Sequence, residues 1–291
     1  MVAHVSVLLG SALELLEIRP GGIYVDATFG AGGHTRAILL RLAEGRVVAL
    51  DADRRAARYA EAIEDPRLTF VHSNFRELDN VLDRCAIGSV DGVLFDLGVS
   101  SMQFDDPQRG FSVASPAAID MRMNPGLGRS AYDVLATASE RELADIFFQF
   151  GEERAARRIA RAIVNRRASG ALPGTTSEFA ALVAGVVQRP GKRERIHPAT
   201  RVFQALRIVV NDELDALRDG LDAAIGRLRT GGRIVAISFH SLEDRIVKQT
   251  FRDDERLEVV TRRPVRPQES ELRENPRSRS AKLRAAQRKA S

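Results

Sequence analysis

The chain has 291 residues, of which 44% are hydrophobic and 29% charged, and this balance excludes an intrinsically disordered protein. No apolar run approaches the roughly 18 residues that span a bilayer. Glu14 and Glu17 interrupt the apolar N-terminal stretch, so a signal peptide is not indicated either. The single cysteine, Cys85, excludes an internal disulfide and a thiolate zinc site, and we expect a cytoplasmic protein without a metal.

Short apolar segments alternate with helix-length segments in the first hundred residues. The pattern predicts helices at residues 35–43 and 54–64, and strands at residues 22–29, 46–51, 68–71 and 92–96. Strands separated by helices indicate βαβ units and a parallel sheet. The sequence therefore predicts an α/β fold.

The alternation stops after Gly98. Between about residues 111 and 198 the helical patterns at 141–150, 152–167 and 177–188 come without a clear strand. Sheet character returns at residues 232–239, and residues 257–261 offer a sixth strand. We therefore expect one sheet domain made of residues 1–110 and 199–291, with an all-helical subdomain of residues 111–198 inserted into it.

Positive charge is concentrated at the end of the chain. The whole chain has 44 Lys and Arg against 39 Asp and Glu, a net charge of +5. Residues 262–291 hold ten of the basic residues and three of the acidic ones, so this tail carries +7 and the rest of the chain −2. We expect an extended tail that contacts a polyanion, with a merely solvated tail as the alternative.

A glycine-rich turn follows the first predicted strand. It reads DATFGAGGHT, and the second strand ends in Asp51, 18 residues beyond Gly33. Ligands of doubly wound sheets bind beyond the carboxyl ends of the strands, and an acid there accepts hydrogen bonds from ribose hydroxyls. The GxGG spacing differs from the GxGxxG of dinucleotide sites, which favours S-adenosylmethionine over NAD. A purely structural turn is the alternative.

Two further strand ends carry polar residues. The fourth strand ends in FDLGVSSMQ, where an acid with neighbouring hydroxyls suits the floor of an active site, and a helix cap is the alternative. The fifth leads into SFHSLED, where Ser241 and Asp244 fit a capping box; a place in the site is the equal alternative, and the two are compatible.

Eight sequence blocks now make a family resemblance recognisable. In chain order they are HVSVLL, DATFGAGGHT, FDLGVSSMQFDDPQRGFS, DMRMNP, GEERAARRIARAIV, HPATRVFQALRIVVNDEL, SFHSLEDRIVK and NPRSRSAKLR. Together they resemble the bacterial small-subunit ribosomal RNA cytosine-N4 methyltransferase family from His4 to Arg284. The resemblance implies a class I methyltransferase (Rossmann-like) sheet with an inserted helical domain. It also implies methylation of N4 of one cytidine in the decoding region of 16S ribosomal RNA, with S-adenosylmethionine as the donor.

The resemblance also implies site residues. The expected cofactor contacts are Gly32, Gly33, His34, Asp51, Phe75, Asp96 and Gln103. By analogy with other amino-methyltransferases, Asp96, with Ser100 or Ser101, is the candidate for drawing the lone pair of the cytosine amino group out of the ring, and a role of Asp96 in cofactor binding alone is the alternative. Three positions depart from the family pattern, namely Ser6, Met102 and Asn124, so we assign no acidic role to residue 124.

Two helical stretches are expected to face the RNA of the small ribosomal subunit. Residues 200, 204, 207 and 211 share one polar helix face, which we expect to form a wall of the substrate cleft, with a solvated surface as the alternative. The helix at 152–167 carries six arginines against two acids, which predicts a strip facing phosphates.

Two rival functions stay open at this point. A DNA amino-methyltransferase would share the fold, but the chain lacks the Asp/Asn-Pro-Pro-aromatic motif, and we expect no DNA substrate. A ribosome-assembly protein with an unused cofactor fold is the second rival, and binding of labelled S-adenosylmethionine separates it from an enzyme.

Overall fold

The computed structural model describes residues 6–114, 116–126, 128–187 and 197–290, and it divides into two compact units. The first unit consists of Met1–Ser101 and Leu214–Ser291, and the second of Met102–Glu213. The second unit interrupts the first between its fourth and fifth strands. It begins before residue 111 and continues past residue 198, because α10 (Thr200–Asn211) packs on α6 (Ala131–Thr137) and α7 (Glu140–Gln149).

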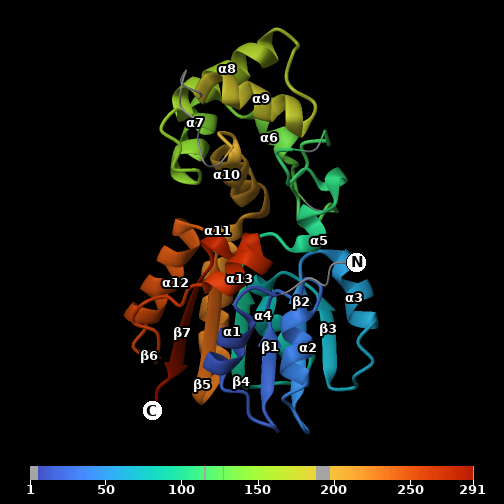
Figure 1. Ribbon diagram of the computed structural model, residues 1–291, viewed down its shortest axis with the longest axis vertical. Helices are drawn as coiled ribbons and strands as arrows, with labels where there is room; N and C mark the ends of the chain where they lie inside the picture. Colours follow the sequence, from blue (N-terminus) through green and yellow to red (C-terminus); the bar gives the residue numbers. More distant parts are fainter. Residues whose placement is uncertain (1–5, 115, 127, 188–196, 291) are drawn as a thin grey trace. The chain divides into compact units, whose positions relative to one another are not determined.

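The first unit is built on one sheet with the strand order β3-β2-β1-β4-β5-β7-β6 (Figure 1). Its strands are β1 (Ile23–Asp26), β2 (Arg46–Asp51), β3 (Leu68–His72), β4 (Val90–Asp96), β5 (Leu228–Ser238), β6 (Leu257–Val259) and β7 (Lys282–Arg288). The strands β1 to β5 are parallel, and β7 runs antiparallel to both β5 and β6. The order and the reversed strand are those of a class I methyltransferase, which confirms the expected fold.

Helices cover both faces of this sheet because its central strands are apolar on both sides. In β4 all residues from Val90 to Phe95 are buried, as parallel strands require. The helices α1 (Leu9–Leu16) and α2 (Gly33–Leu39) lie in front of the sheet in Figure 1, and Leu13 and Ile38 join one core with its strands. Each such side chain contributes about 1.5–3 kcal/mol by its burial.

The remaining helices of the first unit lie before or after individual strands. They are α3 (Ala57–Glu61), α4 (Leu78–Arg84), α11 (Glu213–Arg227), α12 (Ser241–Asp253) and α13 (Glu269–Glu274). The helix predicted at 54–64 is thus shorter, because a 3-10 turn capped by Asp53 occupies Arg54–Ala56.

The second unit is helical. Besides α6, α7 and α10 it contains α5 (Ser101–Phe104), α8 (Ala156–Ala168) and α9 (Thr176–Val187). In neither unit is any helix of the described residues both long and apolar enough to cross a membrane. The capping boxes Ser130–Asp133 and Ser139–Glu142 start α6 and α7. The helix predicted from residue 152 begins only at Ala156, because Glu152 has a positive φ of 49°. Gln188, the predicted end of α9, lies outside the described residues, as do His4 and Val5.

The expectation of an extended basic tail is wrong for most of its length. Residues 269–274 form α13, and residues 282–288 form β7, which lies between β5 and β6. Its residues 283–286 are buried, including Arg284. Removing the chain after Thr261 would therefore take a strand out of the sheet's interior.

One carboxylate binds two of the cations that β7 brings into the sheet. Asp244 on α12 accepts hydrogen bonds from Lys282 Nζ at 2.9 Å and from Arg284 Nε at 2.7 Å. Burial acts to raise the pKa of Asp244, but the hydrogen bonds and charges of Arg284 and Lys282 outweigh it, so the pKa is lowered. The sequence predicts that Asp244 forms a capping box with Ser241, but in the structure its carboxylate binds Lys282 and Arg284 instead.

We expect Asp244→Ala to destabilise the protein by about 3 kcal/mol, because it leaves two partly buried cations without a counter-charge. Urea unfolding at pH 7 measures this loss, and Asp253→Ala, which removes an exposed acid from the same helix, should change stability by less than about 0.5 kcal/mol. Because the folded-state pKa of Asp244 is lowered, its stabilisation is present at neutral pH and is lost as the pH falls through that pKa. Equal effects of the two variants would contradict this role.

Candidate functional site

The turn after β1 has a backbone that requires glycine. Gly30 and Gly32 have φ values of +56° and +79°, where a side chain is strained. A Cβ on Gly32 would also lie 2.7 Å from the Phe29 ring, and one on Gly33 would lie 2.0 Å from Ser6 Oγ. The turn is therefore held between Phe29 and the N-terminal segment, and it leaves backbone rather than side chains at the end of β1.

Asp51 ends β2 beside this turn. Its Oδ2 accepts the Gly30 N–H at 2.7 Å and its Oδ1 accepts the Asp53 N–H at 2.7 Å. Burial raises the pKa of Asp51 to about 7, although these two hydrogen bonds act to lower it. Each oxygen keeps a second lone pair, so the carboxyl group has room for two hydroxyl donors.

Asp26 ends β1 and was not among the expected site residues. It is fully buried, accepts Thr35 Oγ1 at 2.6 Å and the Thr28 N–H at 3.2 Å, and burial raises its pKa to about 6. Thr28 Oγ1 in turn accepts the Asp96 N–H at 2.6 Å. Asp26 thus connects the ends of β1 and β4 through Thr28. The sequence signal that could have identified Asp26 is its position, since it is an acidic residue shortly before the glycine-rich turn.

Asp96 ends β4 with one carboxylate oxygen, Oδ1, that is buried and has no hydrogen-bond partner among the described residues. Its Oδ2 lies 3.6 Å from Nδ1 of His34, whose Nε2 donates to the Val7 carbonyl at 3.2 Å. Burial, with the charges of Asp26 and Glu243, raises the pKa of Asp96 well above its usual value. A buried oxygen without a donor indicates that a polar group of a ligand belongs there.

Phe75 provides an aromatic surface after β3. Its ring meets Phe95 edge to face, with 5.6 Å between the centroids. Asn74 caps the short turn that holds Phe75, and a Cβ on Gly220 would lie 2.7 Å from its ring. Gly220 on α11 therefore makes room for Phe75, which stays half-buried at the carboxyl edge of the sheet.

Ser100 also lies at this edge, since its Cβ is 3.6 Å from where a Cβ of Gly30 would be. Ser101 is half-buried and is the last residue of the first unit, whereas Gln103 is buried and belongs to the second. The first unit thus brings Gly32, Gly33, His34, Asp51, Phe75, Asp96 and Ser100 to one edge.

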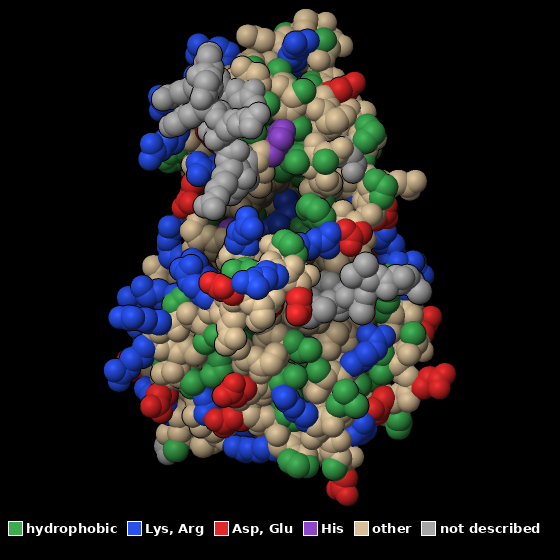
Figure 2. All heavy atoms as spheres, in the orientation of Figure 1, with side chains coloured by type: hydrophobic (Ala, Val, Ile, Leu, Met, Phe, Trp, Pro, Cys, Tyr) green, Lys and Arg blue, Asp and Glu red, His purple; other side chains and the backbone are tan. Residues whose placement is uncertain are grey.

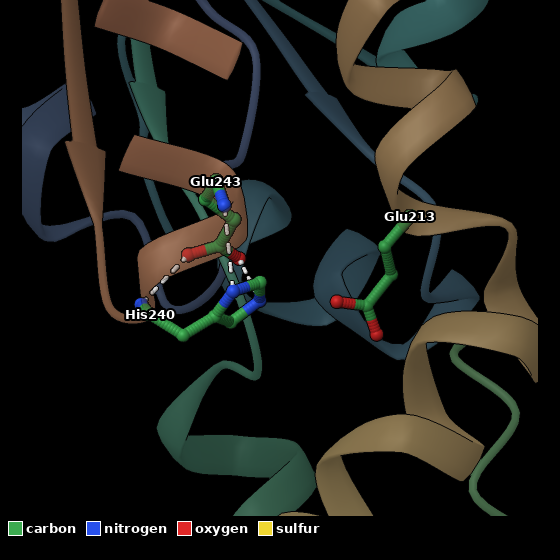
Figure 3. Close-up of side chains that lie close together, drawn as sticks. All are labelled: Glu213, His240 and Glu243. Carbon is green, nitrogen blue, oxygen red and sulfur yellow. Dashed lines mark hydrogen bonds and ion pairs between the residues drawn. The ribbon is translucent and has the colours of Figure 1, made fainter. Parts of the chain in front are cut away.

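The SFHSLED block starts α12, but with a capping box other than the expected Ser241–Asp244 pair. Figure 3 shows the Glu243 carboxylate turned back toward His240: its Oε2 accepts the His240 N–H at 3.3 Å and the Phe239 N–H at 2.8 Å. The His240 Nδ1 accepts the Glu243 N–H at 3.4 Å. The expectation was wrong because histidine takes the cap position one residue earlier. Glu213, also drawn there, pairs with Arg207 of the second unit.

The polar face of α10 is occupied within its own unit. Gln204 donates to the Phe150 carbonyl, Arg207 binds both oxygens of Glu213, and Asn211 donates to the Met121 carbonyl. These contacts hold α10 on the neighbouring loops. The expectation that Gln204, Arg207 and Asn211 form a wall open to substrate is therefore not supported, and Thr200 is the exposed residue of that face.

The arginines of α8 and the turn before it do not form one strip. Arg167 donates to the carbonyls of Leu135, Ala136 and Ala138 at the end of α6. Arg158 donates to the Val186 carbonyl, and Arg161 pairs with Glu140. Exposed arginines whose side chains have no partner among the described residues are Arg154, Arg157 and Arg166.

Comparison with known proteins gives a consistent result over nearly the whole chain. The model of the MraW methylase family matches residues 1–289. The "Ribosomal RNA small subunit methyltransferase H" of Thermomicrobium roseum is 50% identical, with 98% of this chain and 93% of the relative covered. Proteins of the same name from Azoarcus sp. (49% identical, 98% and 96% covered) and Nostoc punctiforme (50% identical, 98% and 94% covered) are similar to it as well.

We expect Asp51→Ala to weaken binding of S-adenosylmethionine by about 1.5–3 kcal/mol, because the variant lacks the charged acceptor for two hydroxyl groups. Calorimetric titration at pH 8 measures the affinity. Asp65→Ala serves as the control, since Asp65 precedes β3 at the opposite edge of the sheet and pairs with Arg67. An affinity unchanged from that of the control would refute this place for the ribose.

Proposed function

Because the chain belongs to the MraW methylase family, we propose that it transfers the methyl group of S-adenosylmethionine to N4 of one cytidine in the decoding region of 16S ribosomal RNA. The names of relatives that share about half of its residues support a small-subunit ribosomal RNA substrate. Ribosomal RNA of bacteria is made and assembled in the cytoplasm, and we place the protein there.

The geometry of the carboxyl edge fits the cofactor. Asp51 has a free lone pair on each oxygen for the two ribose hydroxyls. Phe75 presents a half-buried ring for the adenine, and the backbone of Gly32, Gly33 and His34 approaches without interposed side chains. When bound, S-adenosylmethionine supplies a methyl group on a positively charged sulfur. Gln103, the first buried polar residue beyond Ser101, is the remaining contact that we assign.

The observation that carries the proposal is the Asp96 carboxyl group. The lone pair of cytosine N4 is delocalised into the ring, so the amino group is a poor nucleophile. An oxygen that accepts an amino hydrogen draws this lone pair back to nitrogen, and Asp96 Oδ1 is a buried acceptor without a donor. We assign this role to Asp96, with the hydroxyl of Ser100 or Ser101 as the second polar group.

The raised pKa of Asp96 adapts it to this role. Burial and the neighbouring carboxylates Asp26 and Glu243 disfavour its ionised form. A positive charge beside it would favour that form, so Asp96 becomes an acceptor when the cationic donor is in place. Most of the acceleration then comes from alignment of the reacting atoms, a contribution that can reach about 7–11 kcal/mol.

The helical unit is our candidate for RNA recognition. It offers Arg154, in the turn before α8, and Arg157, in the first turn of α8, both of them exposed, to the phosphate backbone. The target cytidine has to be unstacked or single-stranded for its amino group to reach the half-buried carboxyl of Asp96.

We expect the product to be N4-methylcytidine. Nucleoside mass spectrometry of small-subunit ribosomal RNA, taken from a strain without this gene and treated with the protein and S-adenosylmethionine, should show this nucleoside. Asp96→Ala should abolish it, with Asp65→Ala as the control. Formation of 5-methylcytidine would overturn the assignment, because that chemistry needs a cysteine nucleophile. Cys85 follows α4 at the amino end of β4, at the edge opposite Asp96.

A further inference from the structure

Eight of the ten basic residues of the chain end fall into two groups. Four of them serve the sheet: Lys282 and Arg284 bind Asp244, Arg288 donates to the Ile225 carbonyl, and Lys289 donates to the Glu255 carbonyl. Four others, Arg262, Arg263, Arg266 and Arg279, are exposed, and their side chains have no partner within the described part of the chain. These four arginines, here called the edge arginines, are free to meet a ligand.

The register of β7 places two edge arginines at the carboxyl edge of the sheet. Lys282, the first residue of β7, is opposite Ser238, the last residue of β5. Val265 and Leu283 exchange two backbone hydrogen bonds of 2.9 Å, so Arg266 follows directly at this end of β7. Arg279 precedes it in the turn Pro276–Ser280. This is the edge at which β1, β2 and β4 end in Asp26, Asp51 and Asp96.

Two hydrogen bonds connect the edge arginines' segment to the glycine turn. Glu271 Oε1 on α13 accepts the Leu8 N–H at 2.7 Å. The neighbouring Val7 carbonyl accepts His34 Nε2, and Ser6 Oγ packs against Gly33. The segment Ser6–Leu8 therefore joins α13 to the turn beside the proposed cofactor site. Figure 2 shows Lys and Arg side chains gathered over and around α13, with a few acidic ones among them.

We propose that two of the edge arginines, Arg266 and Arg279, bind the phosphate backbone of the RNA substrate and hold it beside the carboxyl edge of the sheet. The inference rests on the proposed function for the identity of the ligand. Arginine is suited to the task because its planar fork binds phosphate oxygens in pairs and always carries its charge. Glu269 and Glu274 are exposed on α13 and repel phosphates, so the backbone passes over Arg266 and Arg279 rather than along that helix.

The test uses the full-length double variant Arg266→Gln/Arg279→Gln. Its substrate is small ribosomal subunits from a strain without this gene, and methylation is followed at several salt concentrations from about 50 to 200 mM. We expect KM to rise several-fold, kcat to stay the same, and the salt dependence of log(kcat/KM) to become shallower by about 2, or about 1 for each lost phosphate contact. S-adenosylmethionine affinity and the thermal melt should match those of the unaltered protein.

The matched control is Arg41→Gln/Arg46→Gln, which removes the same charge from exposed positions near the amino end of β2. It should leave KM and the salt dependence nearly unchanged. Equal effects of the two double variants would overturn the proposal and reduce the edge arginines to general surface charge. A change in kcat alone would overturn it as well. If the unaltered protein methylates no cytidine of the subunit, the proposed function fails instead, which is a separate outcome.

Discussion

The proposed cofactor site depends on the carboxyl group of Asp51, which holds two turns in place while it is largely shielded from water. Its oxygens fix Gly30 of the glycine turn and Asp53 after β2. Removal from water makes its ionised form costly, which raises its pKa to about 7. Burial also raises the pKa of Asp26 and of Asp96, which end the neighbouring strands. Three desolvated carboxyl groups therefore lie where these parallel strands end. Such a site favours a ligand that brings hydroxyl donors and a positive charge.

The return of the chain end into the sheet is the second feature that shapes the molecule. With β7 between β5 and β6, the SFHSLED helix and the NPRSRSAKLR block become parts of one structure through Asp244. The same return brings α13 against Leu8, next to the segment that supports His34 and Gly33. A segment that looks like a basic tail thus supplies a strand and a brace for the glycine turn, and it carries Arg266 and Arg279, which we propose to bind RNA.

Much of this site was predictable from local patterns, and the rest depended on distant partners. The strands around Asp51 and Asp96 have apolar runs that end in an acid, so their place at the carboxyl edge followed from the parallel sheet. No such signal marks β7, because Arg284 is buried only by virtue of Asp244, 40 residues away. The prediction for the polar face of α10 depended on a distant partner in the same way, since Asn211 donates a hydrogen bond to the carbonyl of Met121, 90 residues away. Histidine as the cap of α12 also lacked a signal, because the usual cap residues stand elsewhere.

Proton release on cofactor binding tests the account of the carboxyl edge most directly. If ribose hydroxyls donate to Asp51, they favour its ionised form, so binding lowers the pKa of this residue, which burial raises to about 7. Calorimetric titration of S-adenosylmethionine at pH 7, in buffers of different ionisation enthalpy, counts the protons released. The account requires release of about half a proton from Asp51, and a correspondingly smaller release by Asp51→Asn. Equal proton release by the two proteins would contradict it.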